Sequence, residues 1–263
     1  MFGCIINCWI RTERMDWMEG KRVSPLYRAL KWVVWLVFPK MKVYGMEHLP
    51  AGEAIIVANH AQMNGPIASE LYLPGNRYTW CAGQMMHWKE VPSYAYQDFW
   101  SQKPKRSHWL FKIAAYLITP LSVLVFNNAN TIGVYHDARL LSTFRTTLQK
   151  LAEGAKIVIF PEHDQKYNNI IYDFQNRFID LAQMHYSKTG RELAFVPMYV
   201  APRLKGMYLG QPVRYCAGAD LAEERVRICD QMMRDITDMA RALPRHTVIP
   251  YRNIRKRDYP QNI

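Results

Sequence analysis

Cysteine is scarce in this 263-residue sequence, which has five cysteines and no Cys-x-x-Cys pair among them. An odd and widely spread set excludes a disulfide framework and indicates a reducing compartment. Cys4 and Cys8, close to the N-terminus, fit lipidation, although two small apolar residues on one helix face explain them as well.

Long hydrophobic runs are missing as well. The apolar stretches 29–38 and 113–126 are both shorter than the roughly 20 residues that cross a bilayer, and the second contains Pro120. We therefore expect no transmembrane helix. A secretory signal is not expected either, because the charges near the N-terminus follow the apolar residues instead of preceding them.

Acidic residues are too few to balance the basic ones, and the net charge is +12. This charge predicts an acidic partner: nucleic acid, an anionic membrane surface, or a phosphate-bearing or acidic carrier substrate. No nucleic-acid motif is recognisable, and aromatic residues lie beside Lys or Arg in apolar stretches such as 27–42. The pattern favours an anionic membrane surface and no nucleic acid; a merely solvated positive surface is the alternative.

Residues 1–40 predict an amphipathic lead-in whose last helix ends at Pro39. Tryptophan among basic residues suits a helix that lies on a membrane surface. The alternative is a helix packed on the domain's own core, because periodicity does not say what an apolar face touches.

Residues 41–263 alternate between expected strands and helices, which predicts one α/β domain with a mixed, largely parallel central sheet flanked by helices. Expected strands lie at 42–45, 54–59, 77–82, 131–136, 156–160 and 193–200. Asp137 and Asp220 are expected to cap helices, and Gly154 to end one. The stretch 109–126 is expected to line an apolar groove for an acyl chain or to form a pair of core helices.

Polar residues follow two of these strands directly. Asn59 and His60 come after the first, and Pro161 and Glu162 after the second. Because ligands bind at the carboxyl ends of strands in such sheets, we expect both segments to open onto one cleft.

These blocks resemble the glycerolipid acyltransferases, the lysophosphatidate and glycerophosphate acyltransferase family. Asn59-His60 is similar to the start of the family motif Asn-His-x-x-x-x-Asp, and 157–165 resembles the strand and Phe-Pro-Glu of Phe-Pro-Glu-Gly-Thr-Arg. The segments 131–139 and 195–200 resemble the strands of two further blocks. The likeness runs from about Val43 to Val200.

The resemblance implies a membrane-associated enzyme at the cytoplasmic face, bound peripherally. It would move a fatty acyl group from acyl-carrier protein or coenzyme A to a glycerolipid-like or other hydroxyl or amine acceptor. It implies no cofactor beyond the thioester co-substrate, and it assigns His60 as the general base, a role that suits a near-neutral imidazole.

The sequence departs from the family where the base needs help. Gly65 stands where the family has the orienting Asp, and Asn64 beside it carries no charge. Glu162 or Asp164 is therefore expected to supply the carboxylate, with Glu162 favoured by the resemblance. The predicted catalytic residues are His60, Glu162 and Asp164.

The family's Gly-Thr-Arg is replaced by His163, Asp164 and Gln165, with Lys166 following. Because an arginine fork is the usual way to bind a phosphate, the acceptor is expected not to be a simple glycerol phosphate. His136 or Arg139 could stand in for the arginine of another block. The predicted substrate-binding residues are Asn59, Asn64, Pro161, His163, Gln165 and Lys166.

Two other functions compete with this one. A catalytically silent lipid- or carrier-binding relative is suggested by Gly65. A metallohydrolase is suggested by the side chains of His60, Glu162, His163 and Asp164, but their spacing matches no zinc motif, and no metal is expected.

Overall fold

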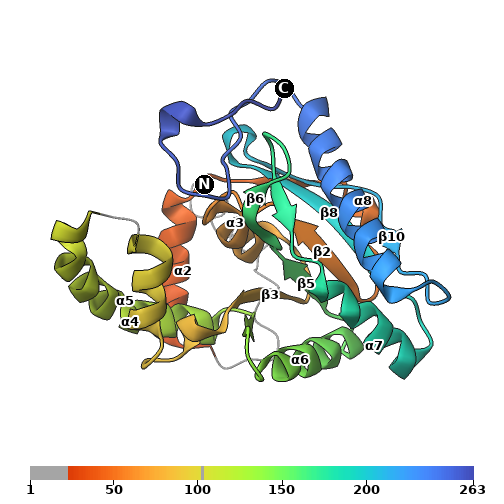
Figure 1. The fold of residues 1–263 in the computed structure, drawn as a ribbon, viewed down its shortest axis with the longest axis horizontal. Coiled ribbons are helices and arrows are strands. Elements are labelled where there is room, and N and C mark those ends of the chain that lie inside the picture. The colour runs from red at the N-terminus through yellow and green to blue at the C-terminus, as the bar shows by residue number, and fades with distance from the viewer. Residues whose placement is uncertain (1–22, 102–103) are drawn as a thin grey trace, which may run out of the picture.

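A mixed β-sheet forms the centre of the computed structural model, which describes residues 23–101 and 104–263 (Figure 1). Within these residues its strand order is β1-β9-β8-β2-β5-β3-β4, and β10 pairs with β8. The strands are β1 (Lys42–Tyr44), β2 (Ala54–Ala58), β3 (Arg77–Ala82), β4 (Thr131–Val134), β5 (Lys156–Ile159), β8 (Ala194–Ala201), β9 (Gly206–Leu209) and β10 (Val213–Arg214).

Most strand pairs are parallel. β2 runs parallel to β5 and β8, β3 runs parallel to β4 and β5, and β1 runs parallel to β9. Only the pairs β8–β9 and β8–β10 in the described sheet are antiparallel. This confirms the predicted fold class, a mixed and largely parallel sheet flanked by helices.

Seven α-helices of the described residues surround the sheet: α2 (Pro25–Val37), α3 (Asn64–Tyr72), α4 (Val91–Ala95), α5 (His108–Asn128), α6 (Leu140–Ala152), α7 (Asp180–Thr189) and α8 (Leu221–Ala242). The side chains of β2 alternate between two cores. Ile55 and Val57 pack into the core that includes α6, α7 and α8, whereas Ile56 and Ala58 pack toward α3. Since both faces are covered, the strand reads as a continuous apolar run.

The expected helix ends are confirmed at two places and wrong at one. Asp220 caps α8 by accepting hydrogen bonds from the main-chain N–H of Ala222 (2.8 Å) and Glu223 (3.2 Å). Gly154 takes the left-handed conformation after α6, with φ of 75°. Asp137 does not cap α6, because the helix begins only after a turn in which its carboxylate accepts from the N–H of Arg139 (2.8 Å).

Residues after β5 form a second, two-stranded sheet. β6 (Glu162–Lys166) pairs antiparallel with β7 (Tyr172–Phe174). Its backbone hydrogen bonds fix the directions in which successive side chains of 162–166 point, and this limits which of them reach the end of β2.

Helix α5 differs from the expectation for 109–126. It is one helix of 21 residues with Pro120 inside it, and only Ala115, Thr119 and Ser122 are buried. Of the described helices, the one spanning Lys105–Asn128 has the length and composition to cross a membrane, and only 17% of its most apolar window is buried. The helix therefore extends well beyond the apolar stretch 113–126 from which no transmembrane helix was expected, and a pair of core helices is not observed there.

The predicted lead-in 1–40 is described only from residue 23 onward; residues 1–22, with Cys4 and Cys8, lie outside the described residues. Within the described part, α2 ends at Val37, just before Pro39, as predicted. Tyr27 and Lys31 are its buried residues, while most of its aromatic and aliphatic side chains are exposed.

Candidate active site at the carboxyl ends of β2 and β5

The carboxyl ends of β2 and β5 lie side by side, because Val57 and Ile159 are partners in the parallel register. The chain leaves β2 at His60 and leaves β5 at Glu162. The carboxylate of Glu162 accepts hydrogen bonds from the main-chain N–H of His60 and, at 2.9 Å, from that of Tyr172. The two segments that the sequence places more than a hundred residues apart are therefore joined through one side chain.

Glu162 is a buried carboxyl group, only 4% exposed. Burial raises its pKa to about 7, against the opposite effect of the two N–H groups that donate to it. The side chain holds the backbone of His60 in place, and its protonation changes near neutral pH.

The imidazole of His60 is oriented by a main-chain group. Its Nδ1 is hydrogen-bonded to the carbonyl oxygen of Gln62. Because a carbonyl oxygen only accepts, Nδ1 carries the proton and Nε2 keeps its lone pair. Nε2 has no hydrogen-bond partner among the described residues, and burial lowers the pKa of His60. The Nδ1 contact and the lowered pKa both favour a neutral imidazole whose Nε2 is unbonded within the described part of the chain.

The turn that makes this contact is strained. Ala61 and Gln62 have φ of 46° and 56°, the left-handed region that costs a non-glycine residue about 1–2 kcal/mol. The side chain of Asn64 donates to the carbonyl of Ala61 at 2.8 Å and helps to hold the turn before α3. Such strain is typical of sites where the backbone is held for function.

Gly65 leaves no room for the orienting acid that the family has there. A Cβ atom on Gly65 would lie 2.7 Å from the carbonyl oxygen of His60 and 2.7 Å from the ring of Phe160. A carboxylate at this position would therefore require the turn to move. The carbonyl of Gln62 occupies the place at Nδ1 that a carboxylate would take.

The C-terminal segment covers the histidine, and sequence reasoning missed it. The ring of Tyr251 meets the imidazole edge-on, with centroids 5.6 Å apart, and Phe160 lies at 5.2 Å on another side. Gln62 donates through Nε2 to the hydroxyl of Tyr259 at 2.9 Å. This segment, dark blue in Figure 1, loops beside β6. Aromatic residues near a C-terminus give no sequence signal for such a contact.

Asp164, the other predicted carboxylate, lies at the surface and not at the imidazole. Its side chain is 80% exposed and pairs with Arg252 of the C-terminal segment. No hydrogen bond or ion pair joins it to His60 in the part of the chain that the structure describes, and the Nδ1 proton is already bonded to Gln62.

Two of the predicted substrate-binding residues are engaged by other parts of the protein. Asn59 is buried and faces β8, where its amide accepts from the N–H of Val200 (2.6 Å) and donates to the carbonyl of the same residue (3.1 Å). His163 contacts Asp173 at 3.2 Å on the β6–β7 sheet. Both side chains therefore have structural partners already.

The other four predicted substrate-binding residues differ in their exposure. Pro161 is buried and Asn64 is partly buried, whereas Gln165 and Lys166 are exposed on β6. The structure therefore brings His60, just after β2, and Glu162, the first residue of β6, together and leaves the later residues of β6 at the surface. No group of three or more His, Cys, Asp or Glu side chains among residues 23–101 and 104–263 is arranged to hold a metal ion.

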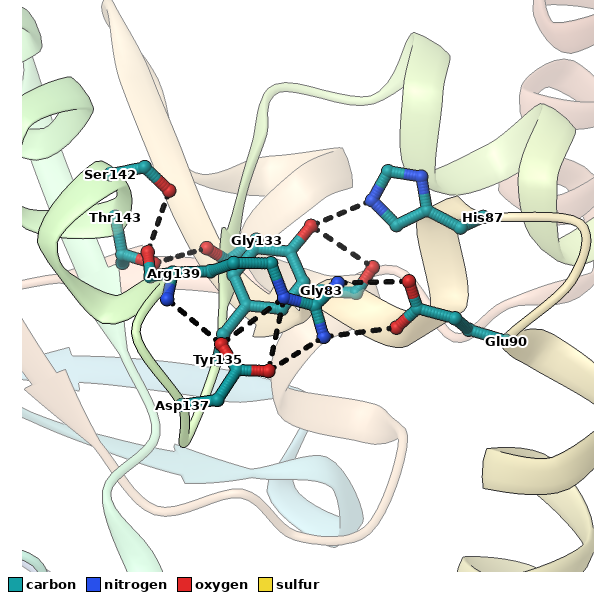
Figure 2. A network of polar contacts seen from close by, with 9 residues as sticks. All are labelled: Gly83, His87, Glu90, Gly133, Tyr135, Asp137, Arg139, Ser142 and Thr143. Carbon is teal, nitrogen blue, oxygen red and sulfur yellow. Dashed lines mark hydrogen bonds and ion pairs between the residues drawn. The ribbon is translucent and has the colours of Figure 1, made fainter.

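A second polar network lies at the end of β4, three strands from β2 in the sheet order (Figure 2). Arg139 donates to both carboxylate oxygens of Glu90, at 2.8 and 3.2 Å, and to Asp137 at 2.9 Å. Its guanidinium also lies over the ring of Tyr135, 4.0 Å from the centroid. The two carboxylates raise the pKa of Arg139 and occupy its donors.

Tyr135 connects this network to the helices after β3. Its hydroxyl lies 2.8 Å from Nε2 of His87, and its ring packs so closely on Gly83 that a Cβ there would lie 2.3 Å from it (Figure 2). Of the two residues considered as stand-ins for the family's arginine, Arg139 is held by two carboxylates and His136 is exposed.

Comparisons with known proteins give a distant likeness in structure and none in sequence. No protein-family model matches the chain, and no curated protein sequence matches it. A solved structure with a similar arrangement is that of the 1-acyl-sn-glycerophosphate (LPA) acyltransferase PlsC from Thermotoga maritima. The TM-score is 0.42 at 15% sequence identity, over 81% of this chain and 80% of that chain.

Proposed function

We propose that the chain is an acyltransferase with His60 as its general base. It would transfer a fatty acyl group from a thioester of acyl-carrier protein or coenzyme A to a hydroxyl or amine. The observation that carries the proposal is the imidazole after the end of β2, whose Nδ1 is bonded to the carbonyl of Gln62 while Nε2 has no hydrogen-bond partner among the described residues. The proposed place of action is the cytoplasmic face of a membrane, with peripheral attachment.

The chemistry needs one proton acceptor beside the acceptor nucleophile. Nε2 of His60 takes the proton as the acceptor oxygen or nitrogen attacks the thioester carbonyl. The carbon–sulfur bond then breaks, and the thiolate leaves with the proton that the imidazolium returns. The products are the acylated acceptor and a free thiol. The carbonyl of Gln62 keeps the ring oriented throughout, in place of a carboxylate.

The acceptor we propose is a glycerolipid-like or other alcohol, or an amine, without a phosphate bound by an arginine fork. Arg139 supports this because its donors are already used by Glu90 and Asp137. Lys166 is exposed on β6 and offers only a point charge. Strong, saturable acylation of lysophosphatidate or glycerol 3-phosphate would contradict this choice of acceptor.

A catalytically silent lipid- or carrier-binding protein is the second candidate. It is favoured by the close packing of Gly65, which leaves the imidazole without a carboxylate at Nδ1. Loss of the acid from such a unit can lower the rate by about ten-thousand-fold. The two candidates differ in one measurable property, the turnover of a thioester.

The test is transfer of a labelled acyl group from coenzyme A or acyl-carrier protein thioesters into a lipid extract, with and without a chelator. Wild type is compared with His60→Ala and with His48→Ala, a control histidine whose ring contacts the carbonyl of Leu209 and lies outside the proposed site. Transfer that is lost only in His60→Ala supports the acyltransferase. No transfer by wild type supports the silent protein, and hydrolysis that the chelator stops supports a metallohydrolase.

A further inference from the structure

Two helices that contact each other, α2 and α5, each expose many apolar side chains. On α5 these residues are more than 45% exposed: Trp109, Leu110, Ile113, Tyr116, Leu117 and Leu121. On α2 the corresponding residues are Leu26, Trp32, Val33, Leu36 and Val37. Single exposed apolar residues are ordinary, but a group of this size on adjoining helices marks an interaction surface.

The helices are fixed to each other and to the body of the protein. Ser24, which precedes α2, donates through its N–H to the side chain of Asn128 at the end of α5 (2.8 Å). Tyr27 on the inner side of α2 donates to Glu70 of α3 at 3.1 Å. The inner side of α5 is held by Ser122, which donates to the carbonyl of Met85 at 2.8 Å. The two helices are therefore fixed to each other and to the rest of the protein, with their apolar side chains pointing outward.

The charge on this surface has one sign. The segments 24–42 and 104–128 contain no Asp or Glu. Their exposed basic residues are Arg28, Lys40, Lys42, Lys105, Arg106 and Lys112. Lys40 lies over the ring of Trp35, which keeps its charge at the end of the apolar surface. Basic side chains at the rim of an apolar and aromatic surface match the headgroup level of an anionic bilayer.

We infer that the outer sides of α2 and α5 form one docking surface for an anionic lipid bilayer, in which the apolar side of α5 enters the membrane interface. The hydrogen bond from Ser122 keeps the inner side of α5 on the protein, so the helix lies in the interface and does not cross the bilayer. A second copy of the chain is a poorer occupant, since it would bring like charges together with no Asp or Glu in segments 24–42 and 104–128 to offset them.

This inference names the membrane that the proposed function would use. It rests on the proposed function only in assuming that docking gives the enzyme access to a lipid acceptor. Binding to vesicles needs no turnover. The two proposals can therefore fail separately.

The test measures co-sedimentation with vesicles of phosphatidylcholine and phosphatidylglycerol, and with vesicles of phosphatidylcholine alone. The variant Ile113→Glu/Leu117→Glu changes residues that are 51% and 75% exposed, and Leu141→Glu on α6, 71% exposed, is the matched control. We expect wild type and the control to bind the anionic vesicles, and the double variant to bind at least about tenfold more weakly.

A charge-reversal variant, Arg106→Glu/Lys112→Glu, keeps the apolar side chains and is expected to lose the preference for anionic vesicles. Equal binding by wild type and both variants would overturn the inference, as would no binding by wild type. Light scattering provides a further check on a second copy as the partner. If wild type is a dimer, and Ile113→Glu/Leu117→Glu makes it a monomer without changing vesicle binding, the surface binds a second copy and the inference is overturned.

Discussion

The Nδ1 atom of His60 is hydrogen-bonded to the main-chain carbonyl oxygen of Gln62, two residues further along the chain. A carbonyl fixes the tautomer and the ring orientation as a carboxylate would. It has no full charge, so it stabilises an imidazolium less. Together with burial, this arrangement favours the neutral ring.

The first prediction concerns the protonation of His60. Burial lowers its pKa from the ordinary value of 6.5, so the ring becomes neutral at a lower pH than an exposed histidine. We expect nitrogen NMR of labelled imidazole to show the Nδ1–H tautomer and a midpoint below 6.5, with the signal assigned by its loss in His60→Ala. An Nε2–H tautomer, or a midpoint above the ordinary value, would contradict the assigned geometry.

The second prediction concerns Gly65. Because any Cβ there meets the carbonyl of His60 and the ring of Phe160 at 2.7 Å, Gly65→Ala should lower the free energy of unfolding by about 1–3 kcal/mol. Gly65→Asp should also fail to increase acyl transfer. Gly218→Ala, where a Cβ meets nothing within 4 Å, is the control and should change stability by less than about 0.5 kcal/mol. Urea denaturation measures the stability of all three, and a Gly65→Asp variant with higher turnover would refute the argument.

The sequence predicts the shared site because of a simple rule of parallel sheets. Two apolar strands that end in polar residues place those residues at the same edge, and His60 and Glu162 do meet there. The orienting group at Nδ1 could not be predicted, since it is a main-chain carbonyl and motifs record only side chains. The contacts of Tyr251 and Tyr259 could not be predicted either, because they depend on the path of the C-terminal segment across the molecule.

The length of α5 could not be predicted for a related reason. Pro120 indicates a break, but proline removes only one donor from a helix, and the exposed side of α5 leaves the freed carbonyl accessible to solvent. The same exposure leaves most of the helix outside the core.

The third prediction separates structure from substrate binding at Asn59. Asn59→Ala would leave the buried N–H and carbonyl of Val200 without partners, so we expect a loss of about 2–4 kcal/mol of unfolding free energy. Asn64→Ala removes one hydrogen bond in a partly buried turn and should cost about 1 kcal/mol. If Asn59 instead binds substrate, Asn59→Ala will raise KM while leaving the urea midpoint unchanged, and that result would contradict the structural role.

The fourth prediction is a dependence of stability on pH that originates in Glu162. Its pKa is about 7 in the folded protein and 4.5 in an ordinary environment, so between these values the folded state binds more protons than the unfolded state. The contribution of this group to the free energy of unfolding therefore falls as pH rises from about 4.5 to 7, by roughly 3 kcal/mol in all.

Glu162→Gln should remove this fall, because the amide does not titrate. It should also lower stability at acid pH. In wild type the two carboxyl oxygens accept hydrogen bonds from the N–H groups of His60 and Tyr172, and in the variant the amide NH₂ would face one of these donors. Urea denaturation at several pH values between about 4.5 and 7.5 measures the slope, with Glu47→Gln at an exposed position as the control that should keep the wild-type slope. If the stability of Glu162→Gln changes with pH in parallel with that of wild type, the carboxyl group has the same pKa in the folded and the unfolded chain. That result would contradict the argument that burial at the start of β6 raises the pKa.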